Sequence, residues 1–170
     1  MGQVQIFNFQ VATRDMEGLT DARGESIKAM LQSDYSISVN SVRVILGYQV
    51  KSNISDKEAE RAIYDLFADP IIEFGDLNQS LIDNKKLFPK SPEIAVTVGF
   101  KPGVTDNAGQ AGLDGLMTIF PEVTKESQVS TTMTYLFWGV PNDISPTWLT
   151  SKLHNQMIER ASISDRKQCL

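Results

Sequence analysis

Residues 20–24 read TDARG and residues 105–109 read TDNAG, so a short motif returns 85 positions later in the same chain. Residues 67–73 (FADPIIE) return more loosely as residues 153–159 (LHNQMIE), 86 positions later. The first motif is typical of a helix start, because Asp is a favourable N-cap, and the second closes a helical pattern. Repetition at a nearly constant spacing predicts two copies of one unit, packed about a pseudo-twofold axis.

The composition indicates a folded globular protein, since 41% of the 170 residues are hydrophobic and 22% are charged. A net charge of −5 argues against nucleic acid or an anionic membrane as the main partner, because both select for clustered Lys and Arg. No apolar run approaches the roughly 20 residues that span a bilayer, and the first residues lack the basic and apolar regions that would predict a secretory leader. The single cysteine excludes an internal disulfide, and we expect a cytoplasmic protein.

Each half of the chain alternates strand patterns with helix patterns. In the first half we expect strands at residues 4–11, 39–50 and 71–74, with helices after Asp21 and Ser55. Gly47 is expected to bend the second strand. Residues 55–58 (SDKE) form a capping box that starts the second helix, and Pro70 ends that helix.

The second half repeats this order. We expect strands at residues 94–98, 129–138 and 158–163, with helices after Asp106 and Ser145. Residues 101–104 (KPGV) predict a turn, since Pro pre-sets φ and Gly tolerates a left-handed conformation. Leu149, Leu153 and Met157 are expected to face inward. The predicted fold class is α+β, with two tandem ferredoxin-like β-α-β(β)-α-β units that share a β-layer and mimic a dimer.

These patterns predict two units and a connection between them. The predicted division is residues 1–75 for the first unit, 76–92 for a linker, 93–164 for the second unit and 165–170 for a polar tail. Leu81 and Ile82 indicate that part of the linker lies on the body of the protein. The tail lacks apolar periodicity, so we expect it to continue into further sequence.

The sequence holds little that could perform catalysis. His154 is the only histidine, which excludes a metal site with two His ligands, and Cys169 stands in the polar tail. Gly109, Gly112 and Gly115 recur three apart on one helix stripe. They match neither phosphate-binding glycine motif, so we interpret them as packing positions. We expect no catalytic, cofactor-binding or metal-binding residue in this chain.

Five residues are candidate contacts with a partner or with the edge of a substrate: Arg43, Lys101, Asp106, Tyr135 and Trp138. Asp106 shares its position with Asp21, and an Asp at a helix start is most simply a cap. Arg43 interrupts a run of β-branched residues, so it either faces solvent or pairs across the sheet. Residues 135–138 (YLFW) are more apolar than one sheet face requires, and we expect part of this cluster to form an interface.

Three motifs carry a family resemblance, and each occurs at the expected place within its half of the chain. They are residues 101–106 (KPGVTD) followed by Gly109, residues 42–43 (VR) in the second strand, and residues 67–73 (FADPIIE). The set resembles the PurS small subunit of phosphoribosylformylglycinamidine synthase, and its tandem copy is similar to the N-terminal region of large single-chain forms. The first half departs from the family pattern at residues 15–19 (DMEGL), where KPGV is expected, and the second half at Gln156, where Pro is expected.

The resemblance implies a non-catalytic scaffold in purine biosynthesis. The complete synthase converts formylglycinamide ribonucleotide to its amidine with ATP and glutamine, and it passes ammonia from a glutaminase site to a synthetase site. PurS-like units bridge these parts and help to shield the ammonia route, so the implied partners are the synthetase and glutaminase domains or subunits. ATP and magnesium would belong to the catalytic part only. Arg43 and Lys101 would touch the substrate phosphate or an acidic partner surface.

Two other functions stay open at this point. One is a free-standing ferredoxin-like regulator that senses a small metabolite between the paired units. The other is an enzyme of the dimeric α+β barrel kind, which usually needs polar groups inside a pocket. The sequence that follows Leu170 would discriminate between a part of the synthase and a regulator.

Overall fold

The computed structural model describes residues 4–165, and within them six strands form one antiparallel sheet. The strands are β1 (Gln5–Thr13), β2 (Ser41–Ser52), β3 (Glu73–Leu77), β4 (Ile94–Phe100), β5 (Gln128–Trp138) and β6 (Glu159–Asp165). The helices are α1 (Ala22–Tyr35), α2 (Asp56–Ala62), α3 (Asn107–Ile119) and α4 (Pro146–Leu153), with a π-helical turn η1 (Ile63–Phe67) and a 3-10 turn η2 (Leu81–Asp83). The strand order is β3-β1-β2-β5-β4-β6, so β2 and β5 join at the centre. The fold class is therefore α+β, compatible with a ferredoxin-like arrangement.

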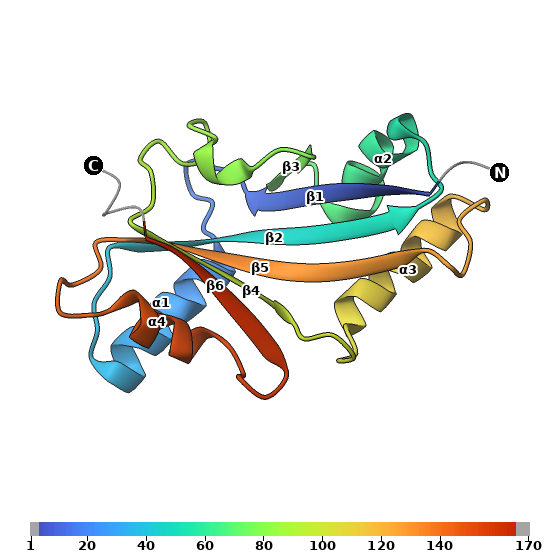
Figure 1. Ribbon diagram of the computed structural model, residues 1–170. Coiled ribbons are helices and arrows are strands. Elements are labelled where there is room, and N and C mark those ends of the chain that lie inside the picture. Colours follow the sequence, from blue (N-terminus) through green and yellow to red (C-terminus); the bar gives the residue numbers. More distant parts are fainter. Residues whose placement is uncertain (1–3, 166–170) are drawn as a thin grey trace.

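The α-helices lie on one face of the sheet, with α1 and α4 near one end and α2 and α3 near the other (Figure 1). Alternation along the strands defines this face, because successive side chains point to opposite sides. Phe9 and Val50 pack in the cluster with α2 and α3. Val44, Val96 and Tyr135 pack in the cluster with α1 and α4. Each end of the sheet thus has a hydrophobic core of its own under one pair of helices.

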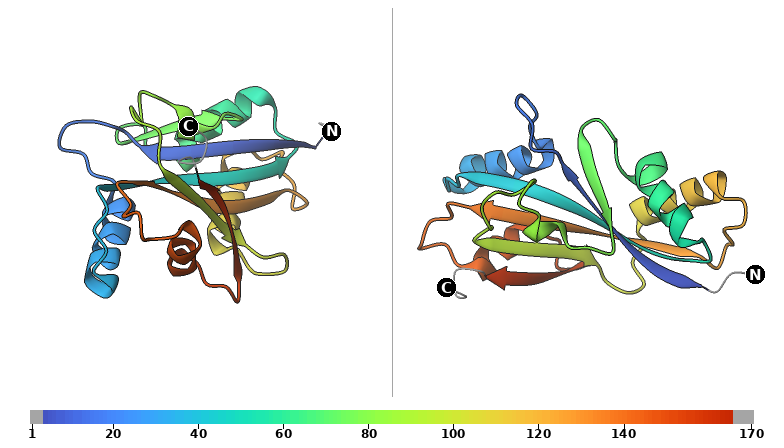
Figure 2. Two further views of the ribbon diagram at one scale, coloured as in Figure 1. Left: turned by 60° about the vertical axis from the view of Figure 1, so that its left-hand side comes forward. Right: turned by 90° about the horizontal axis from the view of Figure 1, so that it is seen from above.

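The glycine stripe of α3 is a packing surface, as the sequence predicts. A side chain at Gly109 would collide with the backbone of β5. Gly112 lies against Phe67, and Gly115 lies against Leu66, so the stripe lets α3 approach η1 closely. Figure 2 shows α2 and α3 side by side at this end of the sheet.

The connection between β3 and β4 is here called the linker (residues 78–93). It crosses the opposite face of the sheet, which carries no α-helix and is here called the helix-free face. Its apolar side chains share a cluster with residues of four strands. The members are Leu81, Leu87 and Phe88 of the linker and Ala12, Ile45, Ala95 and Leu136 of the strands. The backbone N–H of Leu81 also donates to Oε1 of Gln10 at 2.7 Å. The prediction that part of the linker lies on the body of the protein is confirmed.

Two predictions about the first half are wrong in detail. Gly47 does not bend β2, because it is paired on both sides, with Gln10 of β1 and Thr132 of β5. A side chain at Gly47 would collide with Thr132, so close approach of the strands explains this glycine. The linker also begins later than predicted, since Asp76 and Leu77 still pair with β1.

The turns that precede the last strand of each half are longer than predicted. β3 begins at Glu73 rather than at residue 71, and this leaves Ile71 76% exposed. Met157 is 83% exposed instead of inward-facing, because α4 ends earlier and Met157 stands in the turn before β6. β6 extends to Asp165, the first residue of the predicted tail, and the rest of that tail with Cys169 lies outside the described residues.

Hydrogen bonds at the first helix of each half recur at a spacing of 85 to 87 residues. Asp21 and Asp106 each accept one backbone N–H from their own helix and a second from the neighbouring strand. These bonds are Gly24 to Asp21 at 3.0 Å, Val44 to Asp21 at 2.7 Å, Gly109 to Asp106 at 2.7 Å and Thr131 to Asp106 at 2.6 Å. Both Asp residues are therefore helix caps, as predicted, and each also ties its helix to the edge of a strand.

The turns before β3 and β6 recur in the same way. Each turn begins with a side-chain oxygen that accepts the backbone N–H two residues later, and ends with a Glu that accepts from the first residue. The four bonds are Ile71 to Asp69 at 2.8 Å, Met157 to Asn155 at 3.0 Å, Asp69 to Glu73 at 2.9 Å and Asn155 to Glu159 at 2.6 Å. A cation also reaches the carbonyl of the second turn residue, Arg14 to Pro70 at 3.2 Å and Lys101 to Gln156 at 2.6 Å. Because that contact uses backbone oxygen, it survives the exchange of Pro for Gln.

Candidate functional site

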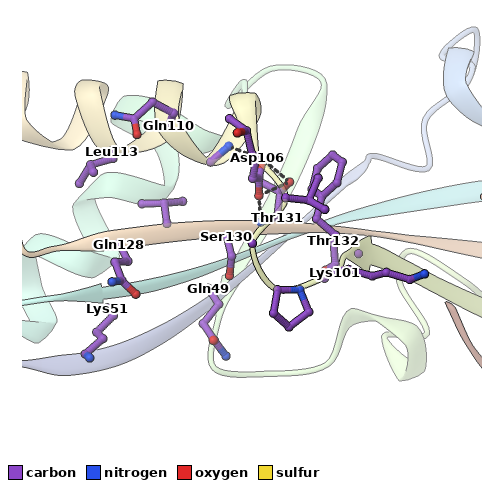
Figure 3. A pocket seen from close by; sticks show the side chains of 18 of the residues that line it. Gln49, Lys51, Lys101, Asp106, Gln110, Leu113, Gln128, Ser130, Thr131 and Thr132 are labelled. Atoms are coloured by element: carbon purple, nitrogen blue, oxygen red, sulfur yellow. Dashed lines mark hydrogen bonds between the residues drawn. The ribbon is translucent and has the colours of Figure 1, made fainter. Parts of the chain in front are cut away.

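A concavity of about 1130 Å³ opens beside the turn that follows β4 (Figure 3). It arises because β5 extends beyond the segment that pairs with β4. Residues 128–131 pair with β2 alone, and β4 joins β5 only at Thr132. The chain turns away from β5 at residues 101–106 and enters α3 instead. The concavity is therefore lined by residues of five strands (β1, β2, β4, β5 and β6), by the turn at residues 101–106, by α3 and by the segment just before β5.

The turn at residues 101–106 is fixed by backbone contacts and by one lysine. Gly103 has φ of 84°, which a residue with a side chain rarely adopts. The backbone N–H of Lys101 donates to the carbonyl of Ile158 at 2.9 Å, and its Nζ donates to the carbonyl of Gln156 at 2.6 Å. An ammonium group has three donors, so Lys101 retains two for another contact.

Asp106 lies in the wall of the concavity but does not offer a free carboxylate. Its Oδ1 accepts from Gly109, and its Oδ2 accepts from the backbone N–H of Thr131. The hydroxyl of Thr131 donates to the same carboxylate, at 3.0 and 2.9 Å from its two oxygens. Figure 3 shows these bonds gathered on Asp106. We therefore assign Asp106 to the support of the site and not to ligand contact.

The lining of the concavity is basic although the chain as a whole is acidic. Its charged side chains are Lys51, Lys101, Lys125, Arg160 and the hydrogen-bonded Asp106. The uncharged polar lining includes Gln49, Thr97, Ser130, Thr132 and Ser162. Four cations thus surround a floor of amide and hydroxyl groups, an arrangement that favours an anionic occupant.

Arg43 and Trp138 lie elsewhere, under the linker. Nη2 of Arg43 donates to the carbonyl of Thr13 at 2.6 Å, and its Nε stands 3.6 Å from Oδ2 of Asp21. The guanidinium carbon lies 5.3 Å from the ring centroid of Phe88 in the linker. Nε1 of Trp138 donates to the carbonyl of Lys90 at 3.1 Å, so both residues hold the linker to the sheet. Beside them is a second cavity of about 500 Å³.

Tyr135 lies on the helix face, and the cluster to which it belongs is largely buried. Leu136 and Phe137 are 0% exposed and Tyr135 is 8% exposed. These three side chains therefore offer little surface to a partner, because both faces of the sheet are covered at this point, and the expectation that part of the cluster forms an interface stays a prediction for Trp138. Burial raises the pKa of Tyr135, and its hydroxyl lies 3.3 Å from Sδ of Met133.

A third cavity, of about 220 Å³, lies on the helix face at the centre of the sheet. Tyr48 and Tyr135 both line it, and burial also raises the pKa of Tyr48. These tyrosines stand 87 positions apart, and this spacing is the one signal in the sequence that could have predicted that they occupy equivalent places around one cavity. The central strand pair Leu46 and Met133 lies between them.

The five candidate residues therefore belong to three places. Lys101 and Asp106 share the basic concavity, Arg43 and Trp138 meet under the linker, and Tyr135 stands apart on the helix face. The sequence alone did not single out Lys51, Lys125 or Arg160. Their approach depends on strand order, which short motifs do not reveal.

Residues 4–165 contain no cluster of three His, Cys, Asp or Glu side chains that could hold a metal ion. His154 follows the last residue of α4, and its Nδ1 lies 2.8 Å from the carbonyl of Thr150 in that helix. Within the same described range, no helix has both the length and the apolarity to cross a membrane. No protein-family model matches the chain, and a search of curated proteins gives no match.

Proposed function

We propose that the chain is a duplicated, PurS-like scaffold of phosphoribosylformylglycinamidine synthase. The recurring hydrogen bonds support the duplication, because unrelated halves would not be expected to repeat cap, strand and turn contacts at spacings that all lie between 85 and 87 residues. The strand order supports it further, since each half places its third strand at the edge of the sheet, its first strand next and its second strand at the centre. β2 and β5 then meet at the centre as the two copies of one strand, paired antiparallel about Leu46 and Met133.

In this proposal the chain bridges the glutaminase and synthetase parts and shields the route of ammonia between them. Both reactions, with ATP and magnesium, take place in those partners. The basic concavity supports a role in binding, because it offers a broad lining of cations and hydrogen-bonding groups. Lys101 is the predicted contact residue that keeps free donors there, whereas Arg43 is occupied by Thr13 and Asp21.

The observation that carries the proposal is the pair of Asp caps, Asp21 and Asp106. Asp106 sits in the motif that carries the family resemblance, Asp21 sits in the repeat of that motif in the first half, and each makes the same two kinds of bond. A cap alone is common, but a cap that also binds the edge of the following strand is a specific arrangement. Its repetition links the sequence motif to one folded unit used twice.

Co-purification with the synthetase and glutaminase components from the same source tests the proposal. We expect the tagged chain to recover both components and to raise glutamine-dependent formation of the amidine. The synthetase assayed with free ammonia serves as a control, because ammonia bypasses the transfer that the scaffold protects. Recovery of neither component, with no effect on glutamine-dependent turnover, would refute the proposal.

The central cavity favours one alternative, a regulator that binds a small metabolite between the two halves. Tyr48 and Tyr135 line that cavity together with Arg23 and Glu159, so both charges and aromatic rings are present. Its volume of about 220 Å³ is smaller than the roughly 300 Å³ at which ligand pockets usually begin. A metabolite screen by thermal shift, followed by Tyr48→Phe and Tyr135→Phe, would detect such a ligand.

A further inference from the structure

The helix-free face of the sheet has two ends with the same strand pairing. At one end Ala12 pairs with Ile45, and 87 positions later Gly99 pairs with Thr132. Ala95 pairs with Leu136, and 87 positions earlier Asn8 pairs with Gln49. The four residues under the linker thus have four counterparts, defined here as residues at equivalent pairing positions in the other half.

The two sets of counterparts differ in chemistry. The set under the linker is apolar and is at most 3% exposed, because Leu81, Leu87 and Phe88 pack on it. The other set is small or polar, and Gly99, Thr132 and Gln49 line the basic concavity. The same surface of the fold is therefore covered by this chain at one end and hollowed at the other.

The chemistry of the open end indicates what could cover it. A segment with apolar side chains, like the linker, would bury amide and hydroxyl groups of the floor without partners, at a cost of roughly 1–3 kcal/mol for each. A segment with carboxylates would instead satisfy those groups and pair with Lys51, Lys125 and Arg160. Ile6, which is 56% exposed and also lines the concavity, offers one apolar contact.

The spread of the cations favours an extended occupant over a compact anion. Figure 3 shows Lys51 and Lys101 at opposite ends of the site, with Gln49 and Ser130 between them. A phosphate-sized ligand needs donors that converge on one point, and Lys51 and Lys101 stand too far apart in this view to do so. The volume of about 1130 Å³ also slightly exceeds the roughly 300–1000 Å³ of small-molecule pockets.

We infer that the basic concavity docks an acidic, extended segment of a partner protein, which occupies at this end the place that the linker occupies at the other. The inference rests on the proposed function for the duplication, and it names the surface through which the scaffold meets a partner. The segment carries carboxylates toward Lys51, Lys125 and Arg160. Its backbone and side chains bond to the amide and hydroxyl groups of the floor.

Fluorescence anisotropy with a fluorescein-labelled peptide of ten glutamates tests the charge of the site. The full chain is compared with a triple variant, Lys51→Glu, Lys125→Glu and Arg160→Glu. Lys101 is left intact, because its bond to Gln156 holds the turn. We expect the dissociation constant to rise by at least about tenfold in the triple variant, and binding to weaken with salt.

The matched control reverses three exposed lysines outside the concavity, Lys57→Glu, Lys86→Glu and Lys90→Glu, with the same change in net charge. It should bind the peptide at least about ten times more tightly than the triple variant does.

If the triple variant fails to fold, Lys51→Gln with Arg160→Gln replaces it, with a weaker effect of the same sign. Absence of binding to the unmodified chain, or equal weakening in the control, would overturn the inference. So would displacement of the peptide by inorganic phosphate beyond that by sodium chloride of equal ionic strength.

Repeating the comparison with the synthetase and glutaminase components separates the two proposals. Recovery of the components by the unmodified chain and the control, but not by the triple variant, supports both. Equal recovery by all three refutes the docking surface and leaves the scaffold role standing. Peptide binding at the concavity without recovery of either component refutes the scaffold role and leaves the surface standing.

Discussion

The two ends of the helix-free face share their strand pairing but not their side chains. Ile45 is 2% exposed beneath the linker, whereas its counterpart Thr132 is exposed in the basic concavity. By contrast, the contacts that join the first helix to the sheet are the same in both halves, at Asp21 and at Asp106. The two halves therefore share the bonds that fix the first helix to the sheet, and they differ in the side chains of the face that the linker covers at one end only.

The largest effect is expected from removing a side chain on the covered end. Phe88 is 3% exposed, so Phe88→Ala should lower the free energy of unfolding by about 3–4 kcal/mol. Thr132→Val, at the open end, keeps the β-branched shape and should change it by less than about 0.5 kcal/mol. Urea denaturation measures both. If the two variants lowered the free energy of unfolding by similar amounts, the two ends of this face would not differ in how tightly they are packed.

The two Asp caps should differ in their contribution to stability. Asp21→Ala leaves Arg43 with 18% of its side chain exposed and without its carboxylate, so we expect a loss of about 3 kcal/mol. Asp106→Ala leaves Gly109 and Thr131 without an acceptor beside an open concavity, and should cost about 1–2 kcal/mol. Thermal and urea unfolding check the order. The first half alone contains a buried ion pair at its cap, between Asp21 and Arg43. A larger loss of stability in Asp106→Ala than in Asp21→Ala would contradict its importance.

The turns before the first helices should respond alike. Gly18 and Gly103 have φ of 77° and 84°, and no atom stands within 4 Å of a side chain added at either position. Gly18→Ala and Gly103→Ala should therefore each cost about 1–2 kcal/mol, from backbone strain alone. The same unfolding assay measures this. No loss at Gly18 would show that residues 15–19 are not equivalent to the second turn.

The smallest effect is expected in how the free energy of unfolding depends on pH, which should differ between the caps of α2 and α4. The carboxyl of Glu122, which must carry the proton that the two acids share, and then the hydroxyl and backbone N–H of Ser55 lower the pKa of Glu58 from 4.5 to about 2. A lowered pKa in the folded state stabilises fully above pH 4.5, and the gain is lost as pH falls toward 2. Glu58→Gln should flatten the dependence of stability on pH in that window. In α4 the Ser145 cap binds Trp148, which does not titrate, so Ser145→Ala should lower stability without changing that slope.

Much of the fold could be predicted from local chemistry. Asp21, Asp106 and Ser145 cap helices, and Ser55 with Glu58 forms the capping box, because cap signals are confined to a few adjacent residues. Alternation and β-branching likewise located the strands to within a few residues. Spacing alone indicated the recurrence that the bonds of Asp21 and Asp106 then display.

The candidate site could be predicted only in part. The KPGV turn marked Lys101, but Lys51, Lys125 and Arg160 come from three other segments that meet only once the strand order is set. The burial of Tyr135, Leu136 and Phe137 could not be predicted, because the crossing of the linker over the outer face of β5 has no local signature. Long-range pairing and burial on two faces are properties of the assembled sheet.

Amide hydrogen exchange of the chain, alone and mixed with the synthetase component, tests the central claim most directly. The account predicts slower exchange at residues 97–106 and 128–132, around the concavity, with little change at residues 42–46 beneath the linker. Protection confined to the helix face around Tyr48 and Tyr135, in a complex that does form, would contradict it.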